Sequence, residues 1–228
     1  MKRISFLISC TYALLSLADV FFSFTEISSW RYITKPLLMP ALMLVLWLET
    51  GRSNIFTKLI FLALACSWAG DISLMFTGYF IYGLAFFLVA HIFYLVSVLQ
   101  IKGQKGILQF QPFFALPIVV YLLLLLSLLS GFLDKLKIPV FVYGIVICSF
   151  WAAAMNLFWK TDRGTASLFF FGSLQFVLSD SLLAVNRFVY PYYLLPGLVM
   201  ATYCTAQFLL TRGAISYNKK FILKPVSN

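Results

Sequence analysis

The sequence predicts an all-α membrane protein, an eight-transmembrane-helix bundle whose two termini both face the cytoplasm. Three observations support this class: an apolar composition, apolar runs of membrane-spanning length, and an uneven distribution of basic residues. Hydrophobic residues make up 62% of the 228 residues and charged residues 11%, and the mean hydropathy is +0.97. Soluble domains carry about 25% charged residues. The composition therefore excludes a soluble enzyme, a disordered regulator and a DNA-binding domain.

The apolar runs are separated by short charged breaks and predict helices at 4–24, 36–49, 57–76, 79–101, 111–130, 138–159, 166–187 and 190–211. Most approach the roughly 20 residues that cross a bilayer, but 36–49 is short, so we expect it to be tilted or partly re-entrant. Residues 140–149 have a strand-like composition. Because a backbone in lipid must satisfy its own hydrogen bonds, we nevertheless expect a helix there.

The basic residues support this count. With eight spans, twelve of the 17 Lys and Arg residues lie on the side of the two termini and five on the other side. The five are Arg31, Lys35, Lys135, Lys137 and Arg187. Cytoplasmic loops are enriched in Lys and Arg, so both termini are expected in the cytoplasm. The net charge of +10 is then explained by basic loop residues that fix the orientation in the membrane and contact anionic headgroups. We therefore expect no nucleic-acid partner.

One transmembrane domain, 1–212, is followed by a basic cytoplasmic tail, 213–228. No second domain is apparent. The expected location is an integral, multi-pass position in a membrane, which would be the inner membrane of a bacterial cell. The sequence leaves the oligomeric state open.

Three acids fall inside the apolar runs: Asp19, Asp71 and Asp180. A charge at the bilayer centre costs at least about 2.5–3.5 kcal/mol, which makes each of them a candidate functional residue. Each lies five to seven residues from the outer end of an outward-running span, or roughly 8–10 Å deep. The remaining acids, Glu26, Glu49, Asp134 and Asp162, lie at span ends or in loops, where we expect solvated charges.

Other polar side chains fall near the same layer and predict a polar pocket that opens toward the outer leaflet. They are Lys35, Tyr143, His91, Tyr94, Tyr203, Gln207, Asn186 and Arg187. Each also has a purely structural interpretation: buried polar groups can join helices, Lys35 can extend to the interface, and tyrosines can pack. We favour function for Asp71 and Asp180, since Ser or Asn would join helices at lower cost. For Asp19 and His91 the two interpretations are evenly balanced.

The sequence gives little support for a metal site or for disulfide bonds. The four cysteines lie in apolar runs without a CxxC pair, and His91 is the single histidine. Phosphate-loop, dinucleotide-binding, HExxH and GxSxG motifs are absent from the sequence. We therefore expect no cofactor and no metal.

Five segments, in order, resemble the motifs of the YhhN family of lysoplasmalogenases. They are KPLLM at 35–39, GDISLM at 70–75, GLAFFLVAHIFY at 83–94, SDSLLAVNRF at 179–188, and MATY at 200–203 followed by Gln207. The first span and residues 102–135 carry no matching motif. The resemblance implies a membrane hydrolase that cleaves the vinyl ether bond of lysoplasmalogens, which are 1-alkenyl-glycerophosphoethanolamine or -choline lipids, giving a fatty aldehyde and a glycerophospho-base.

The residues suit that chemistry. A vinyl ether is hydrolysed by protonation of its β-carbon followed by capture of an oxocarbenium ion by water, which needs an acid, a base and a stabiliser of positive charge. Asp71 and Asp180 divide these roles, as paired carboxyl groups do in glycoside hydrolysis, without an assignment of which is the acid. His91 relays protons or orients water. Lys35 meets the lipid phosphate, and Tyr94, Tyr143, Asn186, Tyr203 and Gln207 shape the pocket. An Asp/Asp/His metal site is the alternative.

The expected partners are a lysophospholipid substrate and the surrounding membrane lipids. Three other functions are compatible with the same residues. Acids and a histidine near the midplane also suit a small proton-coupled transporter. A non-catalytic membrane scaffold would use the acids only to pair helices, and a lipid hydrolase acting on ester or amide bonds is the third alternative.

Overall fold

A computed structural model describes residues 2–25, 28–51 and 54–222 of the chain. All regular structure in these ranges is helical; the one β-type feature among them is an isolated bridge between Phe158 and Thr161. The all-α class is therefore confirmed. The strand-like residues 140–149 lie inside a helix, as expected from the need to satisfy backbone hydrogen bonds in lipid.

The long helices of the described ranges are α1 (Lys2–Phe24), α2 (Arg31–Thr50), α3 (Ile55–Leu74), α4 (Phe80–Leu99), α6 (Leu116–Ser130), α7 (Lys137–Met155), α8 (Arg163–Ala184) and α9 (Leu195–Tyr217). A short helix, α5 (Ile107–Phe110), precedes α6. Single 3₁₀ turns occupy Ser28–Trp30, Pro112–Ala115 and Asp134–Leu136. π-Helical segments, Val185–Val189 and Asn218–Ile222, follow α8 and α9.

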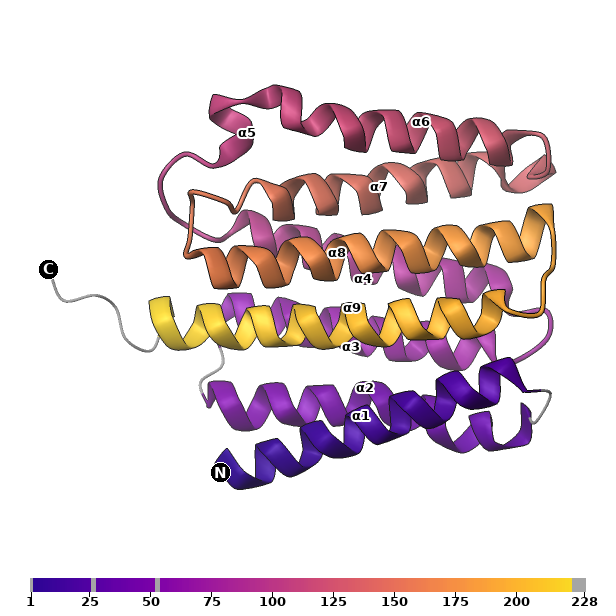
Figure 1. Ribbon diagram of the computed structural model, residues 1–228, viewed down its shortest axis with the longest axis horizontal. Coiled ribbons are helices and arrows are strands. Elements are labelled where there is room, and N and C mark those ends of the chain that lie inside the picture. The colour runs from indigo at the N-terminus through magenta and orange to yellow at the C-terminus, as the bar shows by residue number, and fades with distance from the viewer. Residues whose placement is uncertain (1, 26–27, 52–53, 223–228) are drawn as a thin grey trace, which may run out of the picture.

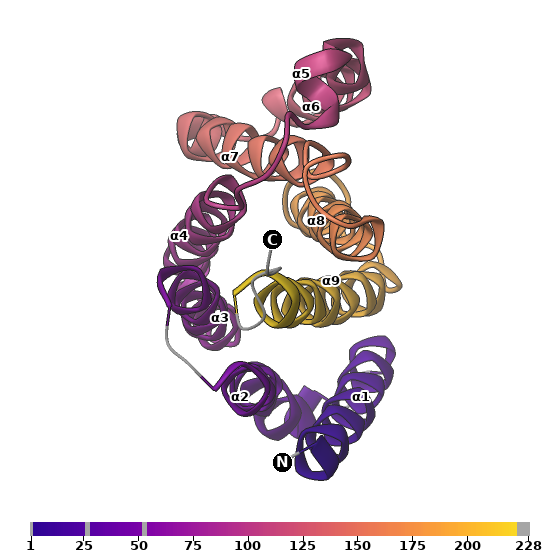
Figure 2. The ribbon, with the colours of Figure 1, turned by 90° about the vertical axis from the view of Figure 1, so that its left-hand side faces the viewer.

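The long helices run side by side along the longest axis of the molecule (Figure 1). Viewed from one end, α2, α3, α4, α7, α8, α9 and α1 follow one another around the bundle, and α5 and α6 lie outside it beyond α7 (Figure 2). Consecutive pairs pack together, and α9 also packs against α1 and α2. This order brings α3 and α8, which are distant in the sequence, to facing sides of one interior.

The two ends of the bundle differ in what they carry. The connections after α1, α3, α6 and α8 lie at one end, here called the cavity end. The start of α1 and the end of α9 lie at the other, here called the terminal end (Figure 1). The termini of the bundle therefore share one end, as an even number of antiparallel helices requires.

Seven helical segments among the described residues are long and apolar enough to cross a membrane. The chain is an integral, multi-pass membrane protein. Many large apolar side chains, such as Leu14, Phe61 and Leu124, are exposed on its surface, where lipid would cover them. α9 has 23 residues but is not one of the seven, because Thr, Tyr, Gln and Arg side chains lower its hydropathy.

The segment at 36–49, which we expected to be short and either tilted or partly re-entrant, is instead part of a 20-residue helix. α2 begins at Arg31, because Arg31 and Lys35 each reach an acidic partner and so join the helix. Pro36 and Pro40 lie inside α2. Pro40 has no N–H for the carbonyl of Pro36, and Trp68 Nε1 donates to that oxygen instead, at 2.9 Å.

Ion pairs join helices at the terminal end. Glu49, which we expected to be a solvated charge, accepts a hydrogen bond from Ser5 and pairs with Arg212 and Lys219. It therefore ties α1 and α2 to the end of α9, a role that sequence reasoning did not assign to it. Of the tail expected at 213–228, residues 213–217 continue α9, and residues 223–228 lie outside the described ranges.

Candidate functional site

A cavity of about 550 Å³ opens among α2, α3, α4, α8 and α9 and includes the π-helical segment after α8. Its polar lining includes Arg31, Lys35, Asp71, Asp180, Arg187 and Tyr203. Its apolar lining includes Leu74, Phe80 and Phe87. The cavity thus brings both predicted catalytic aspartates to one void, from helices more than 100 residues apart in the sequence.

Asp71 lies in the last turn of α3 and is held by two partners. Tyr203 Oη of α9 donates to Asp71 Oδ2 at 2.6 Å, and Lys35 Nζ of α2 lies 3.5 Å from Asp71 Oδ1. The side chain is 2% exposed. A nearby ammonium group and a hydroxyl donor are both interactions that stabilise the ionised form of a carboxyl group.

Asp180 of α8 has a different set of neighbours. Tyr143 Oη of α7 donates to Asp180 Oδ2 at 2.5 Å, and His91 Nε2 of α4 lies 3.7 Å from the same oxygen. Within the described ranges Asp180 forms no ion pair with Lys or Arg. Its side chain is 15% exposed, compared with 2% for Asp71. Asp180 is therefore the more accessible carboxyl group and the one without a permanent cation.

His91, Tyr94 and Gln207 lie behind the cavity wall. All three are fully buried, and none lines the cavity. The ring of His91 contacts those of Tyr143 and Phe176, at centroid distances of 5.4 and 4.4 Å. Tyr94 Oη donates to Gln207 Oε1 at 2.6 Å. The structure thus places these three residues in a layer that supports the wall.

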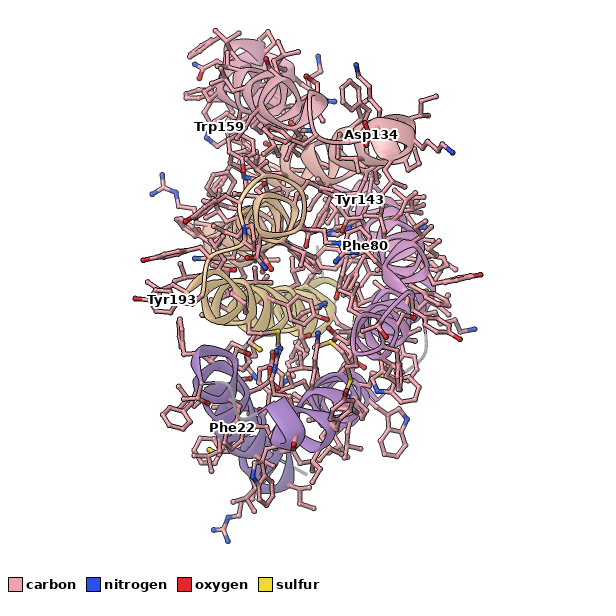
Figure 3. All side chains as sticks on the ribbon, turned by 90° about the vertical axis from the view of Figure 1, so that its right-hand side faces the viewer. Phe22, Phe80, Asp134, Tyr143, Trp159 and Tyr193 are labelled. Atoms are coloured by element: carbon pink, nitrogen blue, oxygen red, sulfur yellow. The ribbon has the colours of Figure 1, made fainter. Side chains whose placement is uncertain are left out.

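Asn186 and Tyr143, which we also predicted to bind substrate, line two different compartments. Asn186 lines the cavity, and its Oδ1 accepts a hydrogen bond from the backbone N–H of Tyr192 at 3.1 Å. Tyr143 lines an adjoining apolar groove rather than the cavity. In the end-on view of Figure 3, Tyr143 and Phe80, which both line this groove, project toward the interior, whereas Tyr193 lies at the periphery.

The apolar groove runs between α4, α6, α7 and α8 and has a volume of about 60 Å³. Leu84, Leu125, Leu129 and Ile147 are among its lining residues. It shares five lining residues with the cavity: Leu74, Phe80, Phe87, Asp180 and Leu183. Asp180 therefore stands at the junction between a polar and an apolar compartment.

Sequence reasoning did not place Arg31 in the pocket, and it counted Arg187 among the polar groups of the pocket without giving it a role; both line the cavity. Arg31 Nη2 lies 3.6 Å from Asp19 Oδ2, and Thr34 Oγ1 donates to Asp19 Oδ1 at 2.7 Å. Asp19 does not line the cavity and joins α1 to α2. The available signal for Arg31 was its spacing four residues before Lys35, which puts both cations on one helix face.

Within the described part of the chain, no group of three or more His, Cys, Asp or Glu side chains comes together in an arrangement that could hold a metal ion. Asp180 and His91 make a pair, and the neighbouring oxygen belongs to a tyrosine.

Comparison with known proteins gives a consistent result. A model of the YhhN family matches residues 30–214. The chain is 36% identical over 180 residues to the mouse protein named lysoplasmalogenase TMEM86B, covering 77% of this chain and 72% of that protein. It is 31% identical over 176 residues to human lysoplasmalogenase TMEM86B, covering 75% and 69%. Human lysoplasmalogenase TMEM86A is 30% identical over 166 residues, covering 68% and 65%. No solved structure matches the chain.

Proposed function

Because the chain belongs to the YhhN family, we propose that it is a membrane hydrolase that cleaves the vinyl ether bond of lysoplasmalogens, releasing a fatty aldehyde and a glycerophospho-base. The observation that carries this proposal is the position of Asp71 and Asp180. Two aspartates with different neighbours line one cavity, and the second also lines an apolar groove. A lipid with a polar head and one alkenyl chain has the same division into a polar and an apolar part as these two compartments, and its vinyl ether would lie at their junction.

In the proposed reaction Asp180 is the acid. It has no Lys or Arg partner within the described ranges, so it can hold a proton in an apolar setting. It gives this proton to the β-carbon of the vinyl ether, and the electron pair of the double bond forms the new C–H bond. The positive charge of the resulting oxocarbenium ion is shared between the former alkenyl C1 and the ether oxygen.

Asp71 is the base and the stabiliser of positive charge. Its carboxylate, which Lys35 and Tyr203 stabilise, attracts the oxocarbenium ion and removes a proton from the attacking water. The hemiacetal that forms then collapses: its hydroxyl proton returns to Asp180, and the glycerol oxygen leaves with the proton held by Asp71. The net change is the addition of one water molecule, and both carboxyl groups return to their initial states.

The predicted supporting residues take roles that match their positions. Tyr143 and His91 orient Asp180, since both lie at its Oδ2. Tyr203 orients Asp71, and the buried Tyr94–Gln207 pair supports the wall behind it. Asn186 fixes the backbone at the cavity rim through Tyr192. No step in this scheme calls for a metal or an organic cofactor.

The topology we propose has eight crossings, with α9 as the eighth and both termini in the cytoplasm. The cavity end then faces the outside, or the lumen of an organelle. Two observations support it: α9 packs alongside α8 (Figure 1), and of the Lys and Arg residues in the described ranges ten lie at the terminal end and five at the cavity end. In this scheme residues 1–212 form a single transmembrane domain, followed by a basic cytoplasmic tail, and in a bacterium the membrane is the inner one.

The test is to purify Asp71→Asn and Asp180→Asn in detergent and to measure aldehyde release from a lysoplasmalogen. General acid–base groups contribute about 10²–10⁴-fold, so each variant is expected to lose at least about 100-fold in kcat. The matched control is Asp162→Asn, an acid at the terminal end that is far from the cavity in sequence and structure; it should keep wild-type turnover. If both site variants stay folded and retain near-wild-type rates, the carboxylate mechanism is wrong. A chelator added to the wild type tests the metal alternative separately.

A further inference from the structure

Arg187 lies in the π-helical segment Val185–Val189, which directly follows the helix that carries Asp180. A π-helical turn is uncommon and occurs frequently at functional sites. The Arg187 side chain lines the cavity, and its guanidinium carbon lies 5.0 Å from the centre of the Phe80 ring. Phe80 lines both the cavity and the groove, so this contact fixes the guanidinium group beside the junction.

Arg187 differs from the other cations of the cavity wall in having no carboxylate partner among the described residues. Arg31 is compensated by Asp19, and Lys35, which we expected to meet the lipid phosphate, is instead compensated by Asp71. Among the described residues Arg187 has no carboxylate within ion-pair distance, and its one specific contact is the aromatic ring. A cation that lines a cavity with no acid of its own is suited to bind an anionic ligand group there.

We propose that Arg187 binds the phosphate of the single-chain ether glycerophospholipid and so positions the vinyl ether at Asp180. This inference rests on the proposed function and adds a specificity-determining residue to it. The two residues are seven positions apart along α8 and its π-helical extension, a separation of about 10 Å, and both side chains line the cavity. Between them the glycerol backbone has room to lie along α8, with the phosphate at the rim and the alkenyl chain in the groove. Arg also offers two parallel donors to a phosphate, which Lys does not.

The experiment measures binding of an uncleavable analogue, 1-alkyl-glycerophosphocholine, to the purified protein in detergent, alongside 1-alkylglycerol of the same chain length, which lacks the phosphate. Arg187→Gln should weaken binding of the phospholipid about tenfold or more, the size of a lost charge-assisted hydrogen bond, and leave binding of the alkylglycerol unchanged. Arg187→Lys keeps the charge and should lie between the wild type and Arg187→Gln. If Arg187→Gln weakens both lipids equally, or neither, the inference is wrong.

Lys137→Gln is the matched control. Lys137 is an exposed cation at the same end of the molecule, with its Nζ 5.9 Å from the centre of the Phe141 ring, and it does not line the cavity. It should affect neither lipid. An equal effect of Lys137→Gln and Arg187→Gln would mean that Arg187 contributes only to the general surface charge, and would overturn the proposal.

Two further arms separate the remaining outcomes. Inorganic phosphate is the probe for a free-phosphate site. It should not displace the alkyl phospholipid, because the lipid chain in the groove adds its own affinity. Displacement by inorganic phosphate at a concentration comparable to that of the lipid would contradict a lipid headgroup as the occupant. The binding readout needs no turnover. A wild type that binds the analogue through Arg187 but releases no aldehyde would refute the proposed hydrolysis and leave the phosphate site standing.

Discussion

Asp71 and Asp180 are the same type of side chain, and their neighbours give them different properties. Asp71 has an ammonium group 3.5 Å away and a tyrosine donor. Asp180 has a tyrosine donor, a buried imidazole and access to the cavity. Pairs of carboxyl groups in unlike environments are a common basis for dividing acid and base roles. The division proposed here depends on Lys35 facing one aspartate and not the other.

Tyr203 and Tyr94 allow the supporting layer to be separated from the reacting one. Each donates a buried hydrogen bond, to Asp71 and Gln207 respectively. Tyr203→Phe and Tyr94→Phe should both destabilise the fold by about 1–3 kcal/mol, since each leaves a buried acceptor without its partner. Tyr203→Phe alone should lower kcat, by about tenfold, because only Tyr203 holds a reacting carboxylate. Thermal unfolding and aldehyde release measure the two effects. Equal losses of kcat in both variants would show that Tyr203 acts only through stability.

At the scale of helices, the sequence predicts where most elements lie but not how far they extend. Apolar runs locate the helices because lipid selects them, as at 138–159, where α7 forms. Charged residues were treated as breaks, and this was wrong for α2, since Arg31 and Lys35 are neutralised by acids on α1 and α3. A glycine such as Gly172 indicates a close approach between helices, but the partner helix was not predictable: a Cβ on Gly172 would lie 2.8 Å from Leu210 Cδ2 of α9. The approach depends on which helices become neighbours.

Asp162 joins two elements at the terminal end and predicts a dependence of stability on pH. It caps α8 by accepting from the backbone N–H of Thr165, and Lys220 donates to it at 2.8 Å. Partial burial raises the pKa of Asp162, but the hydrogen bonds from Lys220 and Thr165 outweigh this, and the net pKa lies below the ordinary 3.8. A carboxyl group whose pKa is lowered by folding adds stability above its unfolded pKa, and this stability is lost as the pH falls through the folded value.

The measurement is the melting temperature of wild type and Asp162→Asn in detergent across the acid range. Asn caps a helix about as well as Asp, so the comparison isolates the charge. The wild type should melt at the higher temperature near pH 7, and the difference should begin to shrink near pH 4 and vanish only below the folded pKa, which is lower than 3.8. A difference that stays constant over this range would mean that the charge of Asp162 does not stabilise the junction of α8 and α9.

At the scale of the whole molecule, the sequence predicts the layer of the site but not its composition. The depths of Asp71 and Asp180 along their helices indicated one shared layer, and the bundle brings both to one cavity. Asp19 has a similar depth but lies on α1, and it contacts α2 rather than the cavity. Arg31 was not expected in the pocket, and Arg187 was expected there without a role, because the hydropathy pattern does not show the order of helices around the bundle that turns both side chains toward the same cavity.

The asymmetric charges predict which face of the membrane the cavity meets. In cells, a membrane-impermeant maleimide should label Lys135→Cys, at the cavity end, without lysis, if that end faces the outside. It should label Lys105→Cys, at the terminal end, only after the membrane is opened. Both side chains are exposed, and the parent chain with its four native cysteines is the control. The reverse pattern of labelling would contradict the proposed orientation while leaving the site itself unaffected.

The most direct test of the account is to follow the proton from Asp180 into the product. Hydrolysis of a lysoplasmalogen by the purified protein in deuterium oxide should give an aldehyde with one deuterium on the carbon next to the carbonyl group, as mass spectrometry of the trapped product would show. Asp180→Asn should give this product at least about 100-fold more slowly, and Asp162→Asn at the wild-type rate. Aldehyde released without that deuterium, or at an equal rate by Asp180→Asn, would contradict protonation of the vinyl ether by Asp180.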